Sequence, residues 1–185
     1  MARDVTMPVW DPFVRLFHWS LLIAFGICYF TQEEEYELHL MAGYLVLGLV
    51  LARIAWGFVG GRHARFGDFL YPPRRVFAHL RGFVHGQLDR YIGHTPAGGV
   101  MTVLLLLDML VITLSGIALD GAENRAGPLA ETSVFTLQEP IRRVHETSTD
   151  IALLLIAIHV AAVLITSRML KENLTRSMLT GRKRP

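Results

Sequence analysis

Cysteine is nearly absent from this chain of 185 residues, which has only Cys28 and no C-x-x-C-H motif. A single cysteine cannot form a disulfide within the chain, and without the motif no haem can be attached covalently in the c-type manner. Cys28 lies in an apolar segment, where a free thiol behaves as a small hydrophobic side chain. Any haem here must therefore be held non-covalently.

Charged residues are scarce in four long stretches, at residues 13–31, 39–59, 97–119 and 145–167. The chain is 52% hydrophobic and has a mean hydropathy of +0.38, which is more apolar than an ordinary soluble domain. Each stretch is long enough to cross the hydrocarbon core of a bilayer as a helix. We therefore expect an all-α integral membrane protein, a bundle of four transmembrane helices forming a single domain over residues 1–185.

The first apolar stretch follows Arg3, as the core of a signal peptide would. Asp4, Asp11 and the lack of a small-residue cleavage site argue against cleavage. We expect this stretch to be retained as the first span.

Basic residues are divided unevenly between the connecting segments. Lys and Arg are concentrated in the N-terminal segment, in residues 60–94 and after residue 167. The third connection has only Arg125, Arg142 and Arg143, and the first has glutamates at 33–35 and 37. Positive charge marks the cytoplasmic side, so both termini of this multi-pass protein should be cytoplasmic. Topology and anionic lipid headgroups explain the basic segments without a nucleic-acid partner.

The connection 60–94 is long enough to contain a helix of its own. After Tyr71-Pro72-Pro73, apolar and basic residues recur at helical spacing as far as Tyr91. This pattern predicts an interfacial helix on the cytoplasmic surface. Its simplest role is anchoring to membrane lipid, and contact with a quinone headgroup stays open.

Two histidines, His145 and His159, lie fourteen residues apart in the fourth stretch. A helix of that length separates them by about 21 Å and turns them onto nearly one face. No single metal ion could bridge that distance, so each histidine needs a partner on another helix. The spacing predicts two cofactor sites at different membrane depths.

Two more histidines have suitable positions for those partners. With the topology above, His39 and His145 lie near the outer face, whereas His18 and His159 lie near the inner face. A single intramembrane histidine could simply hydrogen-bond between helices. Four that match in depth as two pairs favour ligand sites.

The ligand set favours haem over a bare ion. Zinc or copper would need further Cys, His or carboxylate ligands at each level, and the sequence offers no convincing set. A porphyrin supplies four nitrogens and needs only two axial imidazoles between apolar helices. We therefore expect two non-covalent b haems with bis-histidine ligation by His18, His39, His145 and His159, which favours electron transfer over ligand binding at iron.

Arg53 lies fourteen residues after His39, and this spacing places it at the level of the inner haem. A buried arginine needs an anionic partner, for which a haem propionate is suitable, with Arg15 as a second donor. The alternative is that Arg53 extends to the inner interface. His94 precedes the third span and is a candidate for contact with a propionate or a quinone.

Several small or polar residues in the spans have two interpretations. Gly43, Ser115 and Gly116 could make room for a flat macrocycle or allow close helix packing. Asp108, midway along the third span, could relay protons, or it could be protonated or hydrogen-bonded to a neighbouring helix.

One set of motifs extends over nearly the whole chain: Trp10-Asp11-Pro12, Arg15, His18-Trp19, His39, Arg53, Trp56-Gly57, Gly93-His94-Thr95-Pro96, Ser115-Gly116, His145, His159, Glu172-Asn173-Leu174 and Gly181-Arg182-Lys183. The set resembles the bacterial cytochrome b561 family, and within it the b-type cytochrome subunits of nickel-iron hydrogenases. The resemblance implies a four-helix subunit of the bacterial inner membrane, with two b haems, that passes electrons between a periplasmic redox partner and the quinone pool. It implies the same four axial histidines and a quinone site near the inner haem.

The resemblance is incomplete in two respects. Some hydrogenase-type members carry additional chain, and Asp108 stands where an apolar or amide residue is expected. A hydrogenase, a periplasmic c-type cytochrome and another dehydrogenase all stay open as partners, as does a homo-oligomer.

Two other functions compete with that of an electron-carrier subunit. Some short members of the broad family resemble superoxide oxidases, which pass an electron to ubiquinone without a protein partner. A cationic funnel at the outer haem would favour that enzyme, whereas here glutamates oppose Arg142 and Arg143. The third alternative is a haem-free transporter or structural membrane protein.

Overall fold

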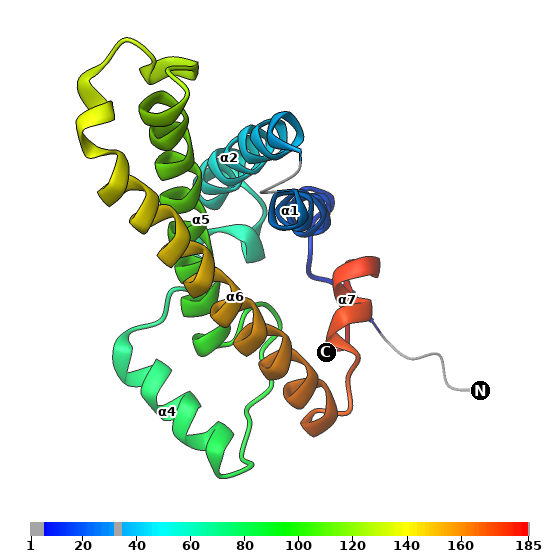
Figure 1. Cartoon of the computed structure of the whole chain (residues 1–185). Coiled ribbons are helices and arrows are strands. Elements are labelled where there is room, and N and C mark those ends of the chain that lie inside the picture. The colour runs from blue at the N-terminus through cyan, green and yellow to red at the C-terminus, as the bar shows by residue number, and fades with distance from the viewer. Residues whose placement is uncertain (1–5, 32–34, 185) are drawn as a thin grey trace. The chain divides into compact units, whose positions relative to one another are not determined.

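The computed structural model describes residues 6–31 and 35–184. Arg3, Asp4, Glu33 and Glu34, which entered the topology argument, lie outside the described residues. Four long apolar helices dominate the fold (Figure 1): α1 (Pro12–Phe30), α2 (Tyr36–Val59), α5 (Pro96–Glu123) and α6 (Gln138–Met169). Each is long and apolar enough to cross a membrane. The prediction of an all-α membrane protein with four such helices is confirmed.

Three of the helices, α2, α5 and α6, extend beyond the spans predicted from hydropathy, whereas α1 is shifted by one residue. The largest difference is at α6, which begins at Gln138, so that His145 lies about two turns inside the helix and not at its start. Glu139 and Arg143 form an i,i+4 pair of 3.5 Å in this polar first part. Pro140 is tolerated in a first helical turn because the amide there has no partner within the helix. Hydropathy detects the apolar part of a helix and misses such a polar extension.

The chain folds as two compact units, each built from separate segments. Unit 1 contains residues 1–19, 53–103 and 157–185, and unit 2 contains residues 20–52 and 104–156. The single membrane domain over residues 1–185 stays a prediction.

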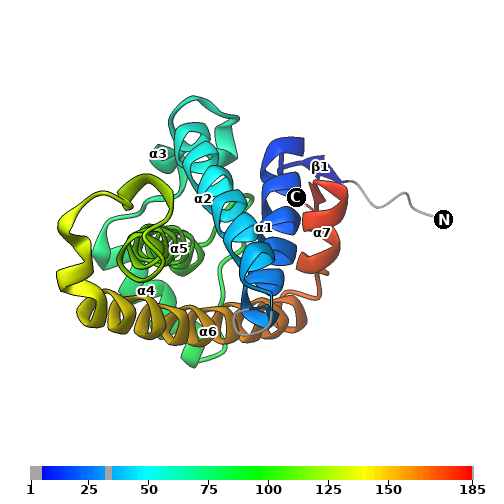
Figure 2. The ribbon, with the colours of Figure 1, turned by 45° about the horizontal axis from the view of Figure 1, so that its top comes forward.

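In unit 1 the two ends of the chain meet. β1 (Met7–Pro8) pairs antiparallel with β2 (Arg182–Lys183), and α7 (Leu174–Thr180) lies beside β1 (Figure 2). Asn173 caps α7 by accepting a hydrogen bond of 2.7 Å from the amide of Arg176. Gly181 ends α7 at a φ of +77°, which only glycine adopts without strain. The sequence did not predict these short elements.

The connection between α2 and α5 also belongs to unit 1. It contains the 3-10 helix η1 (Arg62–Ala64), α3 (Phe66–Phe69) and α4 (Pro73–Val84). The predicted amphipathic helix corresponds to α4 but ends earlier, because Gly86 adopts a φ of +73°. Phe77 and Val84 are exposed on α4, which also contains the basic residues Arg74, Arg75 and Arg81. Its place at the membrane surface stays a prediction.

In unit 2 a buried polar cluster joins the start of α2 to the end of α5. Asp120 is 5% exposed and accepts hydrogen bonds from the hydroxyl of Tyr36 and, at 3.2 Å, from the amide of Asn124. The connection that follows contains η2 (Gly127–Leu129) and η3 (Ser133–Leu137) before α6 begins. The cluster therefore fixes the part of α2 where His39 is located.

Candidate cofactor sites

The structure brings the four predicted histidines together as two pairs, one in each unit. In unit 2 the rings of His39 on α2 and His145 on α6 have centroids 6.3 Å apart. In unit 1 the rings of His18 on α1 and His159 on α6 have centroids 6.4 Å apart. These are the two pairs that the depth argument matched.

Both separations suit one metal ion between two imidazoles. A bond from a transition metal to an imidazole nitrogen is about 2 Å long and the ring centroid lies about 1 Å further, so two opposed rings have centroids about 6 Å apart. Within the described residues no third His, Cys, Asp or Glu joins either pair to complete a site for a bare ion. The geometry thus suits a metal whose other ligands come from a macrocycle.

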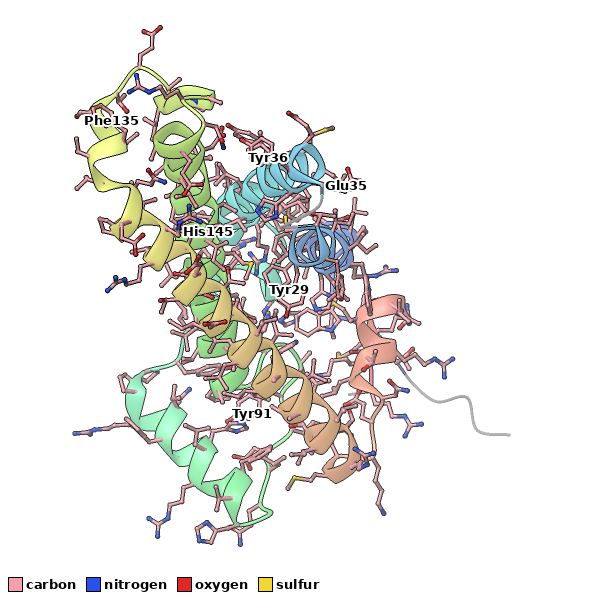
Figure 3. The ribbon with its side chains drawn as sticks, in the orientation of Figure 1. Tyr29, Glu35, Tyr36, Tyr91, Phe135 and His145 are labelled. Atoms are coloured by element: carbon pink, nitrogen blue, oxygen red, sulfur yellow. The ribbon has the colours of Figure 1, made fainter. Side chains whose placement is uncertain are left out.

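The second ring nitrogen of each unit 2 histidine has a backbone partner. His39 Nδ1 donates to the carbonyl of Cys28 at 2.9 Å, and His145 Nδ1 donates to the carbonyl of Ile112 at 3.0 Å. The Ser115 hydroxyl lies 3.3 Å from the same His145 nitrogen (His145 is labelled in Figure 3). A carbonyl can only accept, so Nδ1 holds the proton and Nε2 is left as a metal ligand. These bonds also join helices, but they leave the ligand nitrogens available.

Two glycines beside this pair differ in their surroundings. A Cβ at Gly116 would lie 3.0 Å from the His145 ring, so the absence of a side chain there lets the ring approach α5 closely. A Cβ at Gly43, one turn after His39, would meet no atom within 4 Å. Gly43 therefore does not serve a close helix contact within the described residues, and the space beside it suits a flat cofactor.

Unit 1 contains several buried side-chain nitrogens without a hydrogen-bond partner among the described residues, and two of them belong to His18 and its neighbour. His18 Nδ1 and Trp19 Nε1 are buried and have no hydrogen-bond partner among the described residues. The rings of these neighbours form an edge-to-face contact with centroids 5.1 Å apart. Because buried polar nitrogens are normally paired, these two indicate a partner that the described residues do not supply.

Arg53 on α2 is one of these donors and is only 2% exposed. Its Nη2 donates to the carbonyl of Ala64 at 3.1 Å, whereas its Nη1 has no hydrogen-bond partner in the described part of the chain. The alternative in which Arg53 extends to the interface is wrong, because the residues after α2 fold over the guanidinium and exclude solvent. A buried guanidinium with a spare donor suits a carboxylate ligand.

Arg15 on α1, like Arg53, has one nitrogen that donates to a backbone carbonyl and one buried nitrogen without a partner in the described residues. One of its terminal nitrogens donates to the carbonyl of Leu179, at the end of α7. Its Nε is buried and has no partner within the described residues. The sequence predicted Arg15 as a second donor but not its attachment to the C-terminal segment.

His94 lies between two aromatic rings, with centroids 4.3 Å from that of Phe69 and 4.8 Å from that of Trp10. Its Nδ1 is buried and has no partner among the described residues. Burial, followed by the nearby charges of Arg53 and Lys183, lowers the pKa of His94 to about 3. The ring is therefore neutral at physiological pH and can both donate and accept a hydrogen bond.

Lys183 is a buried cation of this unit that the sequence did not single out. It is 6% exposed, and its Nζ donates to the carbonyl of Tyr91 at 2.8 Å. Burial lowers the pKa of its ammonium. Its neighbour in space, Glu172, accepts a hydrogen bond of 2.8 Å from the amide of Arg184. The motif Gly181-Arg182-Lys183 belongs to the set that carries the family resemblance. Only the pairing of β2 with β1 shows that this segment folds back onto the N-terminal end of the chain.

Asp108 on α5 has a buried Oδ2 without a hydrogen-bond partner in the described residues. Within those residues this oxygen forms no hydrogen bond to a neighbouring helix. Its role as a proton relay stays a hypothesis.

The basic residues that follow α5 are engaged within unit 2. Arg142 forms an ion pair with Glu123, and Arg143 pairs with Glu139 at 3.5 Å. The guanidinium of Arg125 lies 5.2 Å from the ring centroid of Phe135, which Figure 3 labels near the start of α6. These arginines do not form an open group of free cations.

Comparison with known proteins gives matches to one family. The sequence profile of the family described as prokaryotic cytochrome b561 matches residues 9–181. A relative in Rhizobium leguminosarum bv. viciae, named "Probable Ni/Fe-hydrogenase B-type cytochrome subunit", is 24% identical over 162 residues, which cover 79% of this chain and 67% of the relative. No solved structure gives a significant match.

Proposed function

The chain belongs to the prokaryotic cytochrome b561 family, and from that premise we propose that it holds two b haems and passes electrons between a periplasmic partner and quinone. Membership of this family makes the chain a multi-pass bacterial membrane protein and a b-type cytochrome of electron transport, with haem b as its cofactor. The number of haems, their ligands and both reaction partners are the proposed part.

The observation that supports the proposal most strongly is the pair of histidine separations, 6.3 Å and 6.4 Å. Each separation would suit one iron held between the two rings of the pair. Bound haem supplies one-electron chemistry at its iron. His39 with His145 and His18 with His159 would each hold one haem, and ligation by both imidazoles of a pair would favour electron transfer over the binding of a diatomic ligand.

The unpaired donors of unit 1 support a propionate site there. Arg53 Nη1, Arg15 Nε and His94 Nδ1 are buried donors with no partner in the described residues. Arg53 would form the main contact with a propionate carboxylate, because a guanidinium can donate two parallel hydrogen bonds. His94 would bind a propionate or a quinone carbonyl as a neutral donor.

The proposed topology has both termini in the cytoplasm of a bacterial cell. The basic segments favour that side. The pairing of β1 with β2 supports an even number of spans, because strands on opposite sides of a bilayer could not pair. The paired ends of the chain and α4 would then lie on the cytoplasmic side, where quinone would be reduced or oxidised and where α4 would contact lipid.

The partner on the outer side is proposed to be a redox protein. The relative's printed name supports a hydrogenase, and a periplasmic c-type cytochrome or another dehydrogenase would fit equally well. A second copy of the chain could complete the assembly.

A superoxide:quinone oxidoreductase is the second candidate. Such an enzyme needs free cations near the outer haem to attract an anionic substrate. Arg142 and Arg143 are instead engaged with Glu123 and Glu139, which favours docking of a protein. Rapid reduction of the purified protein by superoxide, with quinone as acceptor and no partner present, would support the enzyme.

The experiment is an absorption spectrum of the detergent-purified protein, oxidised and then reduced with dithionite. The expected result is low-spin b-type alpha bands and two haems per chain. His145→Ala and His159→Ala should each remove one haem, whereas His85→Ala, at an exposed position, should remove none. A protein without a Soret band would be the haem-free transporter or structural protein, and loss of neither haem would refute the ligand pairs.

A further inference from the structure

The two histidine pairs differ in what their Nδ1 atoms contact. In unit 2 both imidazoles donate from Nδ1, His39 to Cys28 and His145 to Ile112, and the Ser115 oxygen is 3.3 Å from His145 Nδ1. In unit 1 His18 Nδ1 is buried and has no partner among the described residues. The helices thus polarise both imidazoles of one pair and leave at least one imidazole of the other without such a bond.

This difference changes the electron density on the ligand nitrogens. A hydrogen bond from Nδ1 to a carbonyl makes the imidazole a more basic ligand. A more basic axial ligand stabilises ferric over ferrous iron and so lowers the reduction potential of a haem.

The buried charges of the two units act in the same direction. Among the described residues, the buried charged side chain of unit 2 is Asp120, whereas unit 1 has two cations, Arg53 and Lys183, and one carboxylate, Glu172. An anion disfavours the reduced haem beside it, and a cation favours it.

We infer that the pair His39 and His145 holds the haem of lower reduction potential, and that Ser115 is a positioning residue which helps to set that potential through His145. The inference rests on the proposed ligation of two haems. The Ser115 hydroxyl donates to the Ile112 carbonyl at 3.0 Å, so its oxygen is left to accept a hydrogen bond from His145 Nδ1, 3.3 Å away. Electrons entering at the unit 2 haem would then run to the unit 1 haem without an uphill step.

The test is a redox titration of the full-length protein, followed in the alpha bands and fitted with two one-electron components. Ser115→Ala should raise the midpoint of the lower component only, changing its ratio of reduced to oxidised haem about two- to tenfold at fixed ambient potential. Ser115→Thr, which retains a hydroxyl, should leave the midpoint of the lower component unchanged. Thr113→Val is the matched control, because the Thr113 hydroxyl is buried on the same helix and donates to Met109.

A second variant acts on the other haem and does not depend on α5. Lys183→Gln should lower the midpoint of the higher component only, and Lys183→Arg should preserve it. Equal midpoints in the unmodified protein, or movement of the higher component in Ser115→Ala, would overturn the inference. Fewer than two b-type components would instead overturn the proposed function.

Discussion

Trp56 donates its indole N–H to Asp11 Oδ2 at 3.1 Å, joining the end of α2 to the start of α1. The other carboxylate oxygen of Asp11 accepts from the amide of Val14 at 2.9 Å and caps α1. One side chain therefore both starts a helix and fixes a neighbouring one. This explains physically why the motifs Trp10-Asp11-Pro12 and Trp56-Gly57 occur together in this sequence.

Asp11→Ala should lower the free energy of unfolding by about 2 to 4 kcal/mol, since it removes a helix cap and leaves the indole N–H of Trp56 without its acceptor. Thermal unfolding in detergent measures this effect. Asp89→Ala, at an exposed position, is the control and should change stability little. Equal stability of the two variants would show that the Asp11 contacts contribute nothing.

Arg53→Leu should weaken haem binding in unit 1 by about a hundredfold, because loss of a buried ionic partner costs about 3 kcal/mol. The measurement is haem content per chain, with redox titration of the haem that remains. Arg62→Leu is the matched control, because the side chain of Arg62 is 85% exposed. Unchanged spectra and midpoints in Arg53→Leu would contradict the propionate role.

Gly43→Leu should reduce haem binding in unit 2 about tenfold, because the added side chain would occupy space on the face of α2 that bears His39. Helix content should not change, since the first added carbon meets no protein atom within 4 Å. Gly48→Leu is the control on the same helix. Its surroundings are equally open, but residue 48 is about half a turn away from the His39 face. Equal haem content in both variants would show that Gly43 is not at the cofactor.

His94 should make stability depend on pH. Its pKa is lowered from 6.5 to about 3, so between these values the unfolded chain binds a proton that the folded protein does not. Its contribution is therefore fully present above pH 6.5 and is lost as the pH falls, by about 2 kcal/mol between pH 7 and pH 5. The free energy of unfolding, measured at both pH values for the native protein and for His94→Asn, isolates the contribution of His94. If the free energies of unfolding of the two proteins changed equally with pH, the burial of a neutral His94 ring would be contradicted.

The long helices and the candidate ligands were predictable because each has a periodic or compositional signal. Apolar length located α1, α2, α5 and α6, and the positions of His18, His39, His145 and His159 within them suggested the pairs that the structure brings together. The polar first turns of α6 gave no such signal, because hydropathy treats Gln138 and the residues after it as loop.

The contacts that complete unit 1 could not be predicted from local pattern. Lys183 and Tyr91 are far apart in sequence, as are Arg15 and Leu179, and neither pair has a spacing that a helix or strand imposes. The role of Ser115 was missed for a different reason. Its distance to His145 depends on how α5 and α6 are rotated in unit 2, which composition does not determine.

The pairing of β1 with β2 also constrains biosynthesis. Unit 2 contains no residue beyond 156, so its fold does not depend on the last part of the chain. Unit 1 requires residues 182–183 to reach residues 7–8 after α6 has been inserted. A chain that ends before α7 would therefore retain every residue of unit 2 but would lack the strand that closes unit 1.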